Sequence, residues 1–550
     1  MKFSGRFILT LFALALFVAV SVTFVIGLIL GQSYGRRVTN EQISHLLGGV
    51  VSGGKVGEVA RMIETQYVDV ISADSLAELF IPAMLAELDP HSVYIPAREF
   101  KEAEEALVGE FDGIGITFNM ATDTVLVLNT IPSGPSQKAG VLAGDRVMKV
   151  NDTLISGVKM SQAQVMKRLR GPRGTQVRLS LSRLGVEQPV EVVVTRDAIP
   201  LHSIEASMML TPTIGFIKLS QFARTSFDEV SKAVDTLRSQ GMTSLVFDLR
   251  GNAGGFLDQA ILIANEFLPR GSLIVYTEDR NHKKVRQYSD GRGRATDLEV
   301  AVLIDESSAS SSEILAGALQ DNDRGTIIGR RSFGKGLVQS QVPFKDGSAL
   351  RLTVARYFTP TGRSIQKPYT EGGEEYAMDL VNRYKHNEFF SADSIHFADS
   401  LRFTTPKGKV VYGGGGIMPD EFIPLDTTYM SRYYMEVSGR NILYRYTIEY
   451  ADLHRDALNA VRTMSDLEQL FKRDSLMFER FLDYAAKSGV KREPSQIAHS
   501  RKIMEAQLRA YIARNSALDS DAFYYFIRPI DDTMLRAIEV LDSLQTLKTN

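Results

Sequence analysis

The chain contains no cysteine among its 550 residues. That absence excludes disulfides, thiolate nucleophiles, iron–sulfur clusters, zinc sites built on cysteine and lipid anchors on cysteine, and it leaves the redox compartment open. The net charge is also close to zero, because 63 Lys and Arg residues nearly balance 65 Asp and Glu residues, which gives a formal charge of −2. Since no long basic run is present either, we expect no nucleic-acid partner.

Repeats and low-complexity segments are also missing. Hydrophobic residues make up 44% of the chain and charged residues 23%, with 28 Phe and 20 Tyr, a composition that argues against extensive disorder. At roughly 100–200 residues per domain, the length predicts three or four domains.

An uncharged stretch lies near the N-terminus, from Phe7 to Leu30, with Lys2 and Arg6 before it. About 20 apolar residues let a helix cross a bilayer, and the end of the stretch at 27–31 is a poor match to a signal-peptide cleavage site. We therefore expect an uncleaved signal anchor over residues 1–38, which attaches the chain to the inner membrane and leaves the remainder in the periplasm. A cleaved signal peptide is the alternative, and it would deliver the remainder to the same compartment.

Hydrophobic spacing divides the rest of the chain into four parts. Helical spacing predicts a small helical domain over 39–104, and short β-rich runs predict a β-rich domain over 105–198. Strands that alternate with helices predict an α/β domain with a largely parallel sheet over 199–428, and helical spacing returns over 429–550. The expected fold class is therefore multidomain α/β (α+β).

The individual elements follow from the same spacing. In the β-rich domain we expect strands at 114–118, 124–128, 145–150, 177–182 and 190–195, and a helix at 161–169. In the α/β domain we expect strands at 214–219, 244–249, 300–304 and 326–328, and helices at 226–239, 257–267 and 311–319. Near the C-terminus one helix is predicted over 465–487, with Ser465 and Glu468 as a capping box and Gly489 as its stop.

The helical domain closes on the turn Leu88 to Tyr94, where the Asp-Pro pair ends a helix. His91 beside Asp89 suggests a catalytic pair. Because the two residues are neighbours in one turn, we expect their side chains to tie down the local backbone instead.

A Gly-Ile-Gly-Ile string opens the β-rich domain: Gly113, Ile114, Gly115 and Ile116. Two glycines let successive N–H groups point into one concavity that can hold a carboxylate, and a strand edge beside it accepts an extended peptide. The string alone is weak evidence. Together with the segments 132–141, 144–147 and 171–175, in that order, it resembles a PDZ domain over its full length, which implies recognition of protein C-termini.

Two other patterns lead to functions that we reject. Gly329 to Lys335 obeys G-x-x-x-x-G-K, but Gly336 follows where a phosphate loop needs Ser or Thr, and the next segment has the spacing of a strand. The eight His are scattered and no HExxH occurs, so a zinc hydrolase has little support. We expect no metal and no cofactor.

A serine and a lysine form the remaining candidate site. Burial can lower the pKa of a lysine from about 10.4 by up to about 3–5 units, which would let Lys335 act as a base. Ser310 stands at the carboxyl end of a sheet strand and at the positive end of the next helix, where α/β folds place their sites. The structural alternatives are that Ser310 and Glu313 form a capping box, that Lys335 is a solvated surface lysine and that Gln339 is an ordinary strand amide. Spacing alone leaves these alternatives open.

Several sequence strings decide between the catalytic and the structural interpretations, because they resemble those of a known family. They are SASSSEI at 308–314, FGKGLVQ at 333–339, LTVARYFTPTGRSI at 352–365, DLRGNAGG at 248–255 and GIMPD at 416–420. With the turn at 88–94 and the PDZ-like domain, they resemble the carboxyl-terminal processing peptidases of the S41 serine peptidase family over about residues 40–425. The resemblance implies a peptidase core of the ClpP/crotonase-like type for 199–428.

The resemblance also implies roles. Ser310 matches the nucleophile, Lys335 the general base and Gln339 the residue that orients the lysine. The implied function is a serine endopeptidase that captures protein C-termini in the PDZ groove and cleaves through an acyl-enzyme. A non-catalytic PDZ scaffold of the cell envelope is the competing interpretation.

The resemblance leaves two glycines as candidates for the oxyanion hole, and the chain departs from the family pattern at a few places. A backbone N–H of Gly254 or Gly255, paired with that of Ser311, would hold the oxyanion. Ser311 stands where the family often has Ala. An insertion at 367–411 and the helical extension beyond Met430 lie outside the family core, and both leave room for partner binding or a homo-oligomer.

Overall fold

The computed structural model describes residues 53–120, 123–370 and 372–549. The chain forms two compact units. The N-terminal unit comprises the described residues up to Lys101 with Gln339–Val354 and Tyr369–Met378, and the main unit comprises Glu102–Val338, Ala355–Pro368 and Asp379–Asn550. The predicted signal anchor lies outside the described residues. Among the described helices, none combines the length and the apolar character needed to span a bilayer.

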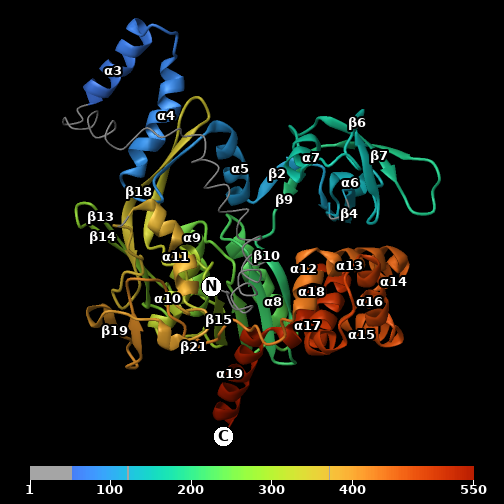
Figure 1. Cartoon of the computed structure of the whole chain (residues 1–550). Coiled ribbons are helices and arrows are strands. Elements are labelled where there is room, and N and C mark those ends of the chain that lie inside the picture. The colour runs from blue at the N-terminus through green and yellow to red at the C-terminus, as the bar shows by residue number, and fades with distance from the viewer. Residues whose placement is uncertain (1–52, 121–122, 371, 550) are drawn as a thin grey trace, which may run out of the picture. The chain divides into compact units, whose positions relative to one another are not determined.

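The N-terminal unit is built mainly from helices (Figure 1). It holds α3 (Gly53–Gln66), α4 (Ala73–Ala86), the start of α5 (Ala97–Val108), β1 (Val93–Ile95) and parts of β17 (Leu337–Pro343) and β18 (Ala349–Phe358). The Oγ of Ser72 accepts a hydrogen bond from the N–H of Ser75 and caps α4. Strand β1 pairs antiparallel with the first half of β18, with Tyr94 opposite Leu350.

Asp89 fixes the turn between α4 and β1. Its carboxylate accepts hydrogen bonds from the N–H of His91 at 2.9 Å, from the N–H of Ser92 at 3.0 Å and from the hydroxyl of Ser92 at 2.6 Å. The ring of His91 lies 2.8 Å (Nε2 to Oη) from the hydroxyl of Tyr376. The backbone-fixing role predicted for Asp89 is confirmed, whereas the side chain of His91 is held by Tyr376.

The β-rich part of the main unit consists of a six-stranded antiparallel sheet, a separate two-stranded sheet and two short helices. Its elements are β2 (Glu110–Gly113), β3 (Ile116–Asn119), β4 (Val125–Thr130), β5 (Arg146–Val150), β6 (Thr153–Leu154), β7 (Gln176–Ser182), β8 (Val190–Thr195), β9 (Asp197–Pro200), α6 (Pro135–Lys138) and α7 (Gln162–Leu169). The strand order is β3-β4-β5-β7-β8, β6 pairs with β5, and β2 pairs with β9. All five predicted strands and the predicted helix are present. Among the described strands of this sheet, β3 lies at one edge.

The α/β core of the main unit has a six-stranded sheet in the order β10-β11-β12-β15-β16-β21. The strands are β10 (Ile204–Met209), β11 (Ile214–Leu219), β12 (Ser244–Asp248), β15 (Glu299–Ile304), β16 (Thr326–Gly329) and β21 (Glu421–Phe422), and the helices are α8 (Ser226–Ser239), α9 (Leu257–Phe267) and α10 (Ser311–Asp321). Only β10 runs antiparallel to its neighbour. A hairpin of β13 (Leu273–Asp279) and β14 (Lys284–Tyr288) pairs with the end of β18. The largely parallel sheet predicted from the alternating elements is confirmed.

Both faces of this sheet are covered, which explains why its strands are almost continuously apolar. In β12, Phe247 packs with the helices α8 to α10 on one face. Val246 faces the other way and packs with Met534 and Leu541 of α19 (Asp532–Thr549). The last helix of the C-terminal extension therefore completes the core around the six-stranded sheet.

The rest of the extension is a helical bundle with its own core. Its helices are α12 (Arg432–Gly439), α13 (Ile442–Leu453), α14 (Arg455–Ala460), α15 (Met464–Arg473), α16 (Met477–Lys487), α17 (Pro494–Ala513) and α18 (Asp519–Ile527), followed by a 3-10 turn (Arg528–Ile530). The prediction of a single helix over 465–487 is wrong, because the helix is interrupted between α15 and α16. The capping box is formed by Thr463 and Asp466 rather than by Ser465 and Glu468. Gly489 follows α16 with φ +86°, as predicted for a stop.

The insertion at 367–411 has secondary structure of its own. It contains α11 (Gly373–Lys385), two 3-10 turns (Ala392–Ser394 and Asp399–Leu401) and β19 (Arg402–Thr404), which pairs antiparallel with β20 (Val410–Tyr412). The second half of α11 belongs to the main unit.

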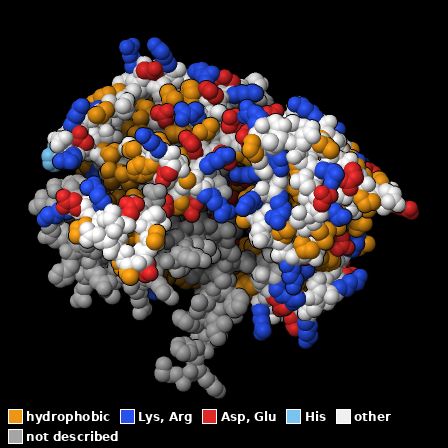
Figure 2. All heavy atoms as spheres, turned by 90° about the horizontal axis from the view of Figure 1, so that it is seen from above, with side chains coloured by type: hydrophobic (Ala, Val, Ile, Leu, Met, Phe, Trp, Pro, Cys, Tyr) orange, Lys and Arg blue, Asp and Glu red, His pale blue; other side chains and the backbone are white. Residues whose placement is uncertain are grey.

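Charged side chains on the surface are of both signs. On the face drawn in Figure 2, basic and acidic side chains of the described residues are interspersed. The near balance of 63 basic and 65 acidic residues leads us to expect such a surface.

Candidate active site

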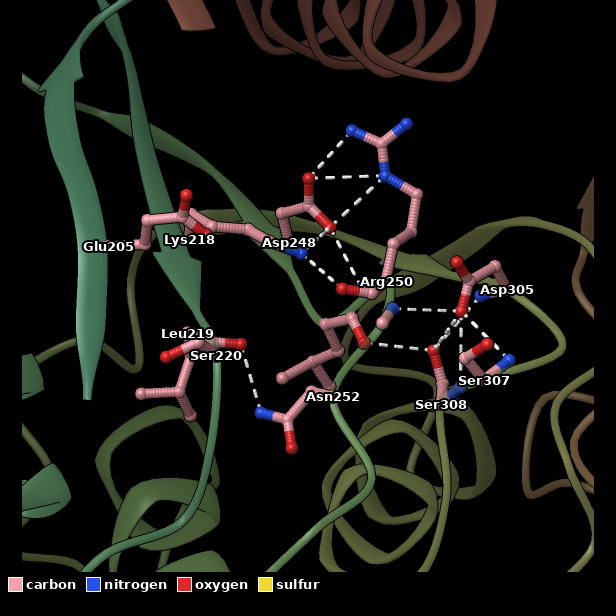
Figure 3. A network of polar contacts seen from close by, with 12 residues as sticks. Glu205, Lys218, Leu219, Ser220, Asp248, Arg250, Asn252, Asp305, Ser307 and Ser308 are labelled. Carbon is pink, nitrogen blue, oxygen red and sulfur yellow. Dashed lines mark hydrogen bonds and ion pairs between the residues drawn. The ribbon is translucent and has the colours of Figure 1, made fainter. Parts of the chain in front are cut away.

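The turn after β12 carries a network of polar contacts at the carboxyl edge of the core sheet (Figure 3). Asp248 is fully buried, and it accepts hydrogen bonds from the N–H of Arg250 at 2.8 Å and from Nη2 of Arg250 at 2.6 Å, with Nζ of Lys218 at 3.2 Å. Burial would raise the pKa of Asp248, but the positive charges of Arg250 and Lys218 outweigh it and lower the pKa to about 2. The ionised carboxylate holds the start of the turn in place.

Asn252 and Asp305 fix the middle of the same turn (Figure 3). Nδ2 of Asn252 donates to the carbonyl of Leu219 at 2.9 Å, and Oδ1 accepts from the N–H of Gly254 at 2.8 Å. Oδ1 of Asp305 accepts from the N–H of Gly251 at 2.9 Å. These bonds attach the turn to β11 and to the loop after β15, and they fix the conformation of its glycine-rich backbone.

Ser310 is half-buried where that loop enters α10. Its backbone has φ 54° and ψ −112°, a region that costs a non-glycine residue about 1–3 kcal/mol. The N–H of Ala309 and the hydroxyl of Ser312 both donate to the carbonyl of Asn252, at 3.0 and 2.8 Å. The surroundings therefore impose the strained conformation, and strain held in this way is characteristic of functional sites.

Gly254 approaches Ser310 so closely that no side chain fits. A Cβ on Gly254 would lie 2.8 Å from Cβ of Ser310 and 2.9 Å from the amide nitrogen of Ser311. The amide of Gly254 already donates to Asn252. Those of Gly255 and Ser311 have no acceptor among the described residues, and the hydroxyl of Ser311 donates to the carbonyl of Gly255 at 3.0 Å. Two backbone donors therefore lie close to Ser310.

Glu313 joins the segment of Ser310 to the segment of Lys335. Its fully buried carboxylate accepts at Oε2 from the N–H of Ser310 at 2.9 Å and of Lys335 at 2.8 Å. Oε1 accepts from the N–H of Gly334 at 2.7 Å and from the hydroxyl of Ser332 at 2.6 Å. Burial raises the pKa of Glu313, and these four donors oppose the rise. The capping contact between Ser310 and Glu313 is thus present, and the same carboxylate also holds the backbone of Lys335.

Tyr357 makes a second connection between the two segments. Its hydroxyl lies 3.1 Å from the carbonyl oxygen of Ser310 and 2.5 Å from that of Lys335. Lys335 itself is half-buried. The structure therefore brings together the backbones that carry Ser310 and Lys335, although they lie on different elements.

The structure places Gln339 in the N-terminal unit, whereas Ser310 and Lys335 belong to the main unit. Within its own unit, Nε2 of Gln339 lies 3.4 Å from Oγ1 of Thr353, and that hydroxyl donates to Oδ1 of Asp89 at 3.0 Å. The role predicted for Gln339 stays a prediction.

The Gly-Ile-Gly-Ile string leads into the edge strand β3. Gly115 has φ +71°, a conformation that favours glycine, and the side chain of Ile114 is buried. The carbonyl of Gly115 accepts from Ile131 and that of Ile114 accepts from Ser136, which fixes the string against the following loop. Helix α7 begins at a capping box formed by Ser161 and Gln164.

The structure bears on the phosphate-loop pattern at Gly329 to Lys335. The segment after Lys335 forms strand β17, so the G-x-x-x-x-G-K string lacks the helix that a phosphate loop requires. Within the described ranges, no group of His, Cys, Asp and Glu side chains is arranged to hold a metal ion.

Sequence reasoning missed the roles of Glu313 and Tyr357. Glu313 was recognised only as a capping partner of Ser310, because three-residue spacing is a local signal. Its contact with Lys335 bridges 22 residues, and that of Tyr357 with Ser310 bridges 47. The sequence carries no local signal for either contact.

Comparison with known proteins identifies the family. Sequence profiles match for "Peptidase family S41" at 213–373, for "PDZ domain" at 113–194 and for a "Family of unknown function" at 433–516. A carboxy-terminal-processing protease of Bartonella bacilliformis is 40% identical over 317 residues, which are 57% of this chain and 72% of that protein. The chain belongs to the carboxy-terminal processing proteases of peptidase family S41.

Two further members of this protease family are similar to the chain. The carboxy-terminal processing protease CtpA of Bacillus subtilis is 32% identical over 314 residues, 57% of this chain and 66% of that protein. A solved photosystem II D1 C-terminal processing protease is 26% identical, covering 71% of this chain and 95% of its own at a TM-score of 0.34. Family membership rests on the sequence relatives. As a carboxy-terminal processing protease, the chain is a serine-type peptidase with a PDZ domain, which sets aside the non-catalytic scaffold.

Proposed function

We propose that Ser310 is the nucleophile and Lys335 the general base of this carboxy-terminal processing protease, with Gln339 orienting the lysine. The neutral amine of Lys335 takes the hydroxyl proton of Ser310 as Oγ attacks the scissile carbonyl carbon. The C–N bond then breaks, Lys335 returns the proton to the leaving amine, and water hydrolyses the acyl-enzyme. The observation that carries the proposal is the Glu313 carboxylate, which holds the backbones of both residues.

We propose that the oxyanion hole consists of the amides of Gly255 and Ser311. Of the two glycines considered, Gly254 has its amide engaged by Asn252, which favours Gly255. The amide of Ser311 begins α10, where the helix dipole also favours a developing negative charge.

Substrate capture is proposed for the PDZ domain. The amides of residues 113–116 form the nest for the terminal carboxylate, and the edge strand β3 takes the preceding residues of the tail as an added strand. No metal or cofactor enters the reaction, since Ser310 and Lys335 supply both nucleophile and base.

One experiment tests nucleophile and tail capture together. A peptide substrate with a free C-terminal carboxylate and the same peptide as a C-terminal amide are each mixed with the full chain, with a chelator present, and quenched in acid. Mass spectrometry is expected to find the acyl group on Ser310, forming roughly 10–100-fold faster with the free acid, because hydrogen bonds to a charged group are worth about 1.5–3 kcal/mol. An acyl group on another residue contradicts the nucleophile, and equal rates for the two peptides contradict the nest.

We propose further that residues 1–38 anchor the protease in the inner membrane with its catalytic part in the periplasm. The support is the uncharged stretch at 7–30 and the basic residues before it. The full chain is expected to stay with membranes after an alkaline wash and to be digested by protease added outside the inner membrane. Release of the protein by the wash would favour the cleaved signal peptide. Light scattering of the purified protein would show whether it forms a homo-oligomer.

A further inference from the structure

The segment Arg331–Gly336, which carries Lys335, has no regular secondary structure. It is nevertheless largely buried, so its backbone groups need partners from elsewhere in the protein. Glu313 accepts from the N–H groups of Gly334 and Lys335, as described above. The carbonyl side of the same segment is held by a different element.

Arg383 of helix α11 supplies donors to that carbonyl side. Its side chain is 2% exposed. Nη1 donates to the carbonyl of Ser332 at 2.8 Å and Nη2 to the carbonyl of Phe333 at 3.1 Å, and the carbonyl of Arg331 lies 3.4 Å from Nη1. One rigid guanidinium therefore fixes successive peptide groups just before Gly334 and Lys335.

The orientation of Arg383 is itself fixed. Oδ2 of Asp379, one turn earlier on α11, lies 3.0 Å from Nε of Arg383 and 2.9 Å from Nζ of Lys367. Lys367 also places its ammonium 4.0 Å from the centre of the Phe333 ring, and its N–H donates to the carbonyl of Gly334 at 3.0 Å. Arginine, aspartate and lysine thus form one buried cluster around the base-bearing segment.

Arg383 comes from the insertion, beyond the stretch 213–373 that matches the family profile. No role for it follows from the resemblance. We infer that Arg383 is a positioning residue for the general base. It holds the carbonyls of Ser332 and Phe333, while Glu313 holds the amides of Gly334 and Lys335. The backbone of Lys335 is thereby fixed, and with it the position from which its side chain extends. This inference rests on the proposed role of Lys335.

The consequence is a specific kinetic defect. Without the guanidinium, the carbonyls of Ser332 and Phe333 lose these donors and the segment relaxes, which moves Lys335 relative to Ser310. Substrate tails bind at the PDZ domain, which does not include this segment. Loss of Arg383 is therefore expected to slow acylation without weakening tail binding.

The test compares Arg383→Ala and Arg383→Lys in the full chain. Arg383→Ala is expected to lower kcat and the rate of acyl-Ser310 formation by roughly 10–100-fold with KM within about twofold of wild type, since hydrogen bonds from a charged donor are at stake. Arg383→Lys keeps the charge and one donor, and is expected to recover part of the loss. Millimolar guanidinium added to Arg383→Ala is expected to restore part of the rate.

The matched control is Arg324→Ala. Arg324 donates in the same way to backbone carbonyls, those of Ala295 and Thr296, but it lies at the other end of the core sheet. It is expected to keep the wild-type kcat and to show no guanidinium effect. Hydrogen exchange of peptides spanning 331–336 keeps the inference testable if Arg383→Ala is unstable, because in Arg383→Lys these amides should exchange faster than in the wild type, while those of α10 exchange at the wild-type rate.

The outcomes separate two failures. Wild-type acylation in both Arg383 variants, a defect confined to KM, or unchanged exchange in 331–336 would overturn the inference and leave the nucleophile and base in place. An acyl group that forms on a residue other than Ser310 would overturn the proposed function itself.

Discussion

Ser310→Ala is expected to lower kcat by about 10⁴–10⁶-fold, the scale seen when the nucleophile of a serine protease is removed. The hydroxyl is the only group of this residue that the mechanism uses. The strained backbone at φ 54° and the N–H of Ser310 that donates to Glu313 are main-chain features, which alanine retains. Rates of peptide cleavage and melting temperatures of the variant and the wild type measure the two effects separately.

The matched control for this substitution is Ser307→Ala, in the same loop and also half-buried. It is expected to cleave at the wild-type rate. Ser310→Ala should still bind a free-acid tail with wild-type affinity, because the PDZ domain is unchanged. Residual cleavage within about 100-fold of wild type in Ser310→Ala would show that another group attacks the peptide.

Lys335→Arg is expected to reduce kcat by at least about 10³-fold, although the charge and most of the side-chain length are kept. A guanidinium has a pKa above 12 and does not deprotonate in the working pH range, so it cannot take the proton of Ser310. The backbone contacts of Lys335 with Glu313 and Tyr357 are preserved, so the fold should be unaffected. Steady-state kinetics on a peptide substrate measures the loss.

The control here is Lys345→Arg, since Lys345 is exposed, and it is expected to be fully active. The double variant Ser310→Ala with Lys335→Arg adds a sharper criterion. Because nucleophile and base act as one unit, it should be no slower than Ser310→Ala alone. Losses that multiply would mean that the two residues act in separate steps.

The order of the elements in the α/β core could be predicted because it follows from local periodicity. Helices over 226–239 and 257–267 and the strand at 214–219 are found where the sequence places them. Strands β10, β13 and β14 and helix α11 were not foreseen. The pairing of β13 with β18 joins segments that are distant in sequence, so it leaves no local signal, whereas β10 pairs with β11 and β14 with β13, their neighbours along the chain.

The helix predicted over 465–487 shows the limit of the same reasoning. The helical spacing of apolar residues continues across the interruption between α15 and α16, so the periodicity predicts one helix. The capping side chains Thr463 and Asp466 lie two residues before the pair chosen from the sequence. Two S/T-x-x-D/E strings compete there, and packing selects one of them.

The sequence alone determined which chemical groups this protease has available. It has no cysteine and no metal motif, and the strings around Ser310 and Lys335, through their resemblance to the family, point to a hydroxyl and an amine as the proposed reactive pair. Only the tertiary structure decided what holds that pair. Glu313 and Arg383 reach the base-bearing segment from a helix N-terminus and from an insertion, and contacts between such distant segments depend on how the chain packs rather than on the spacing of its residues.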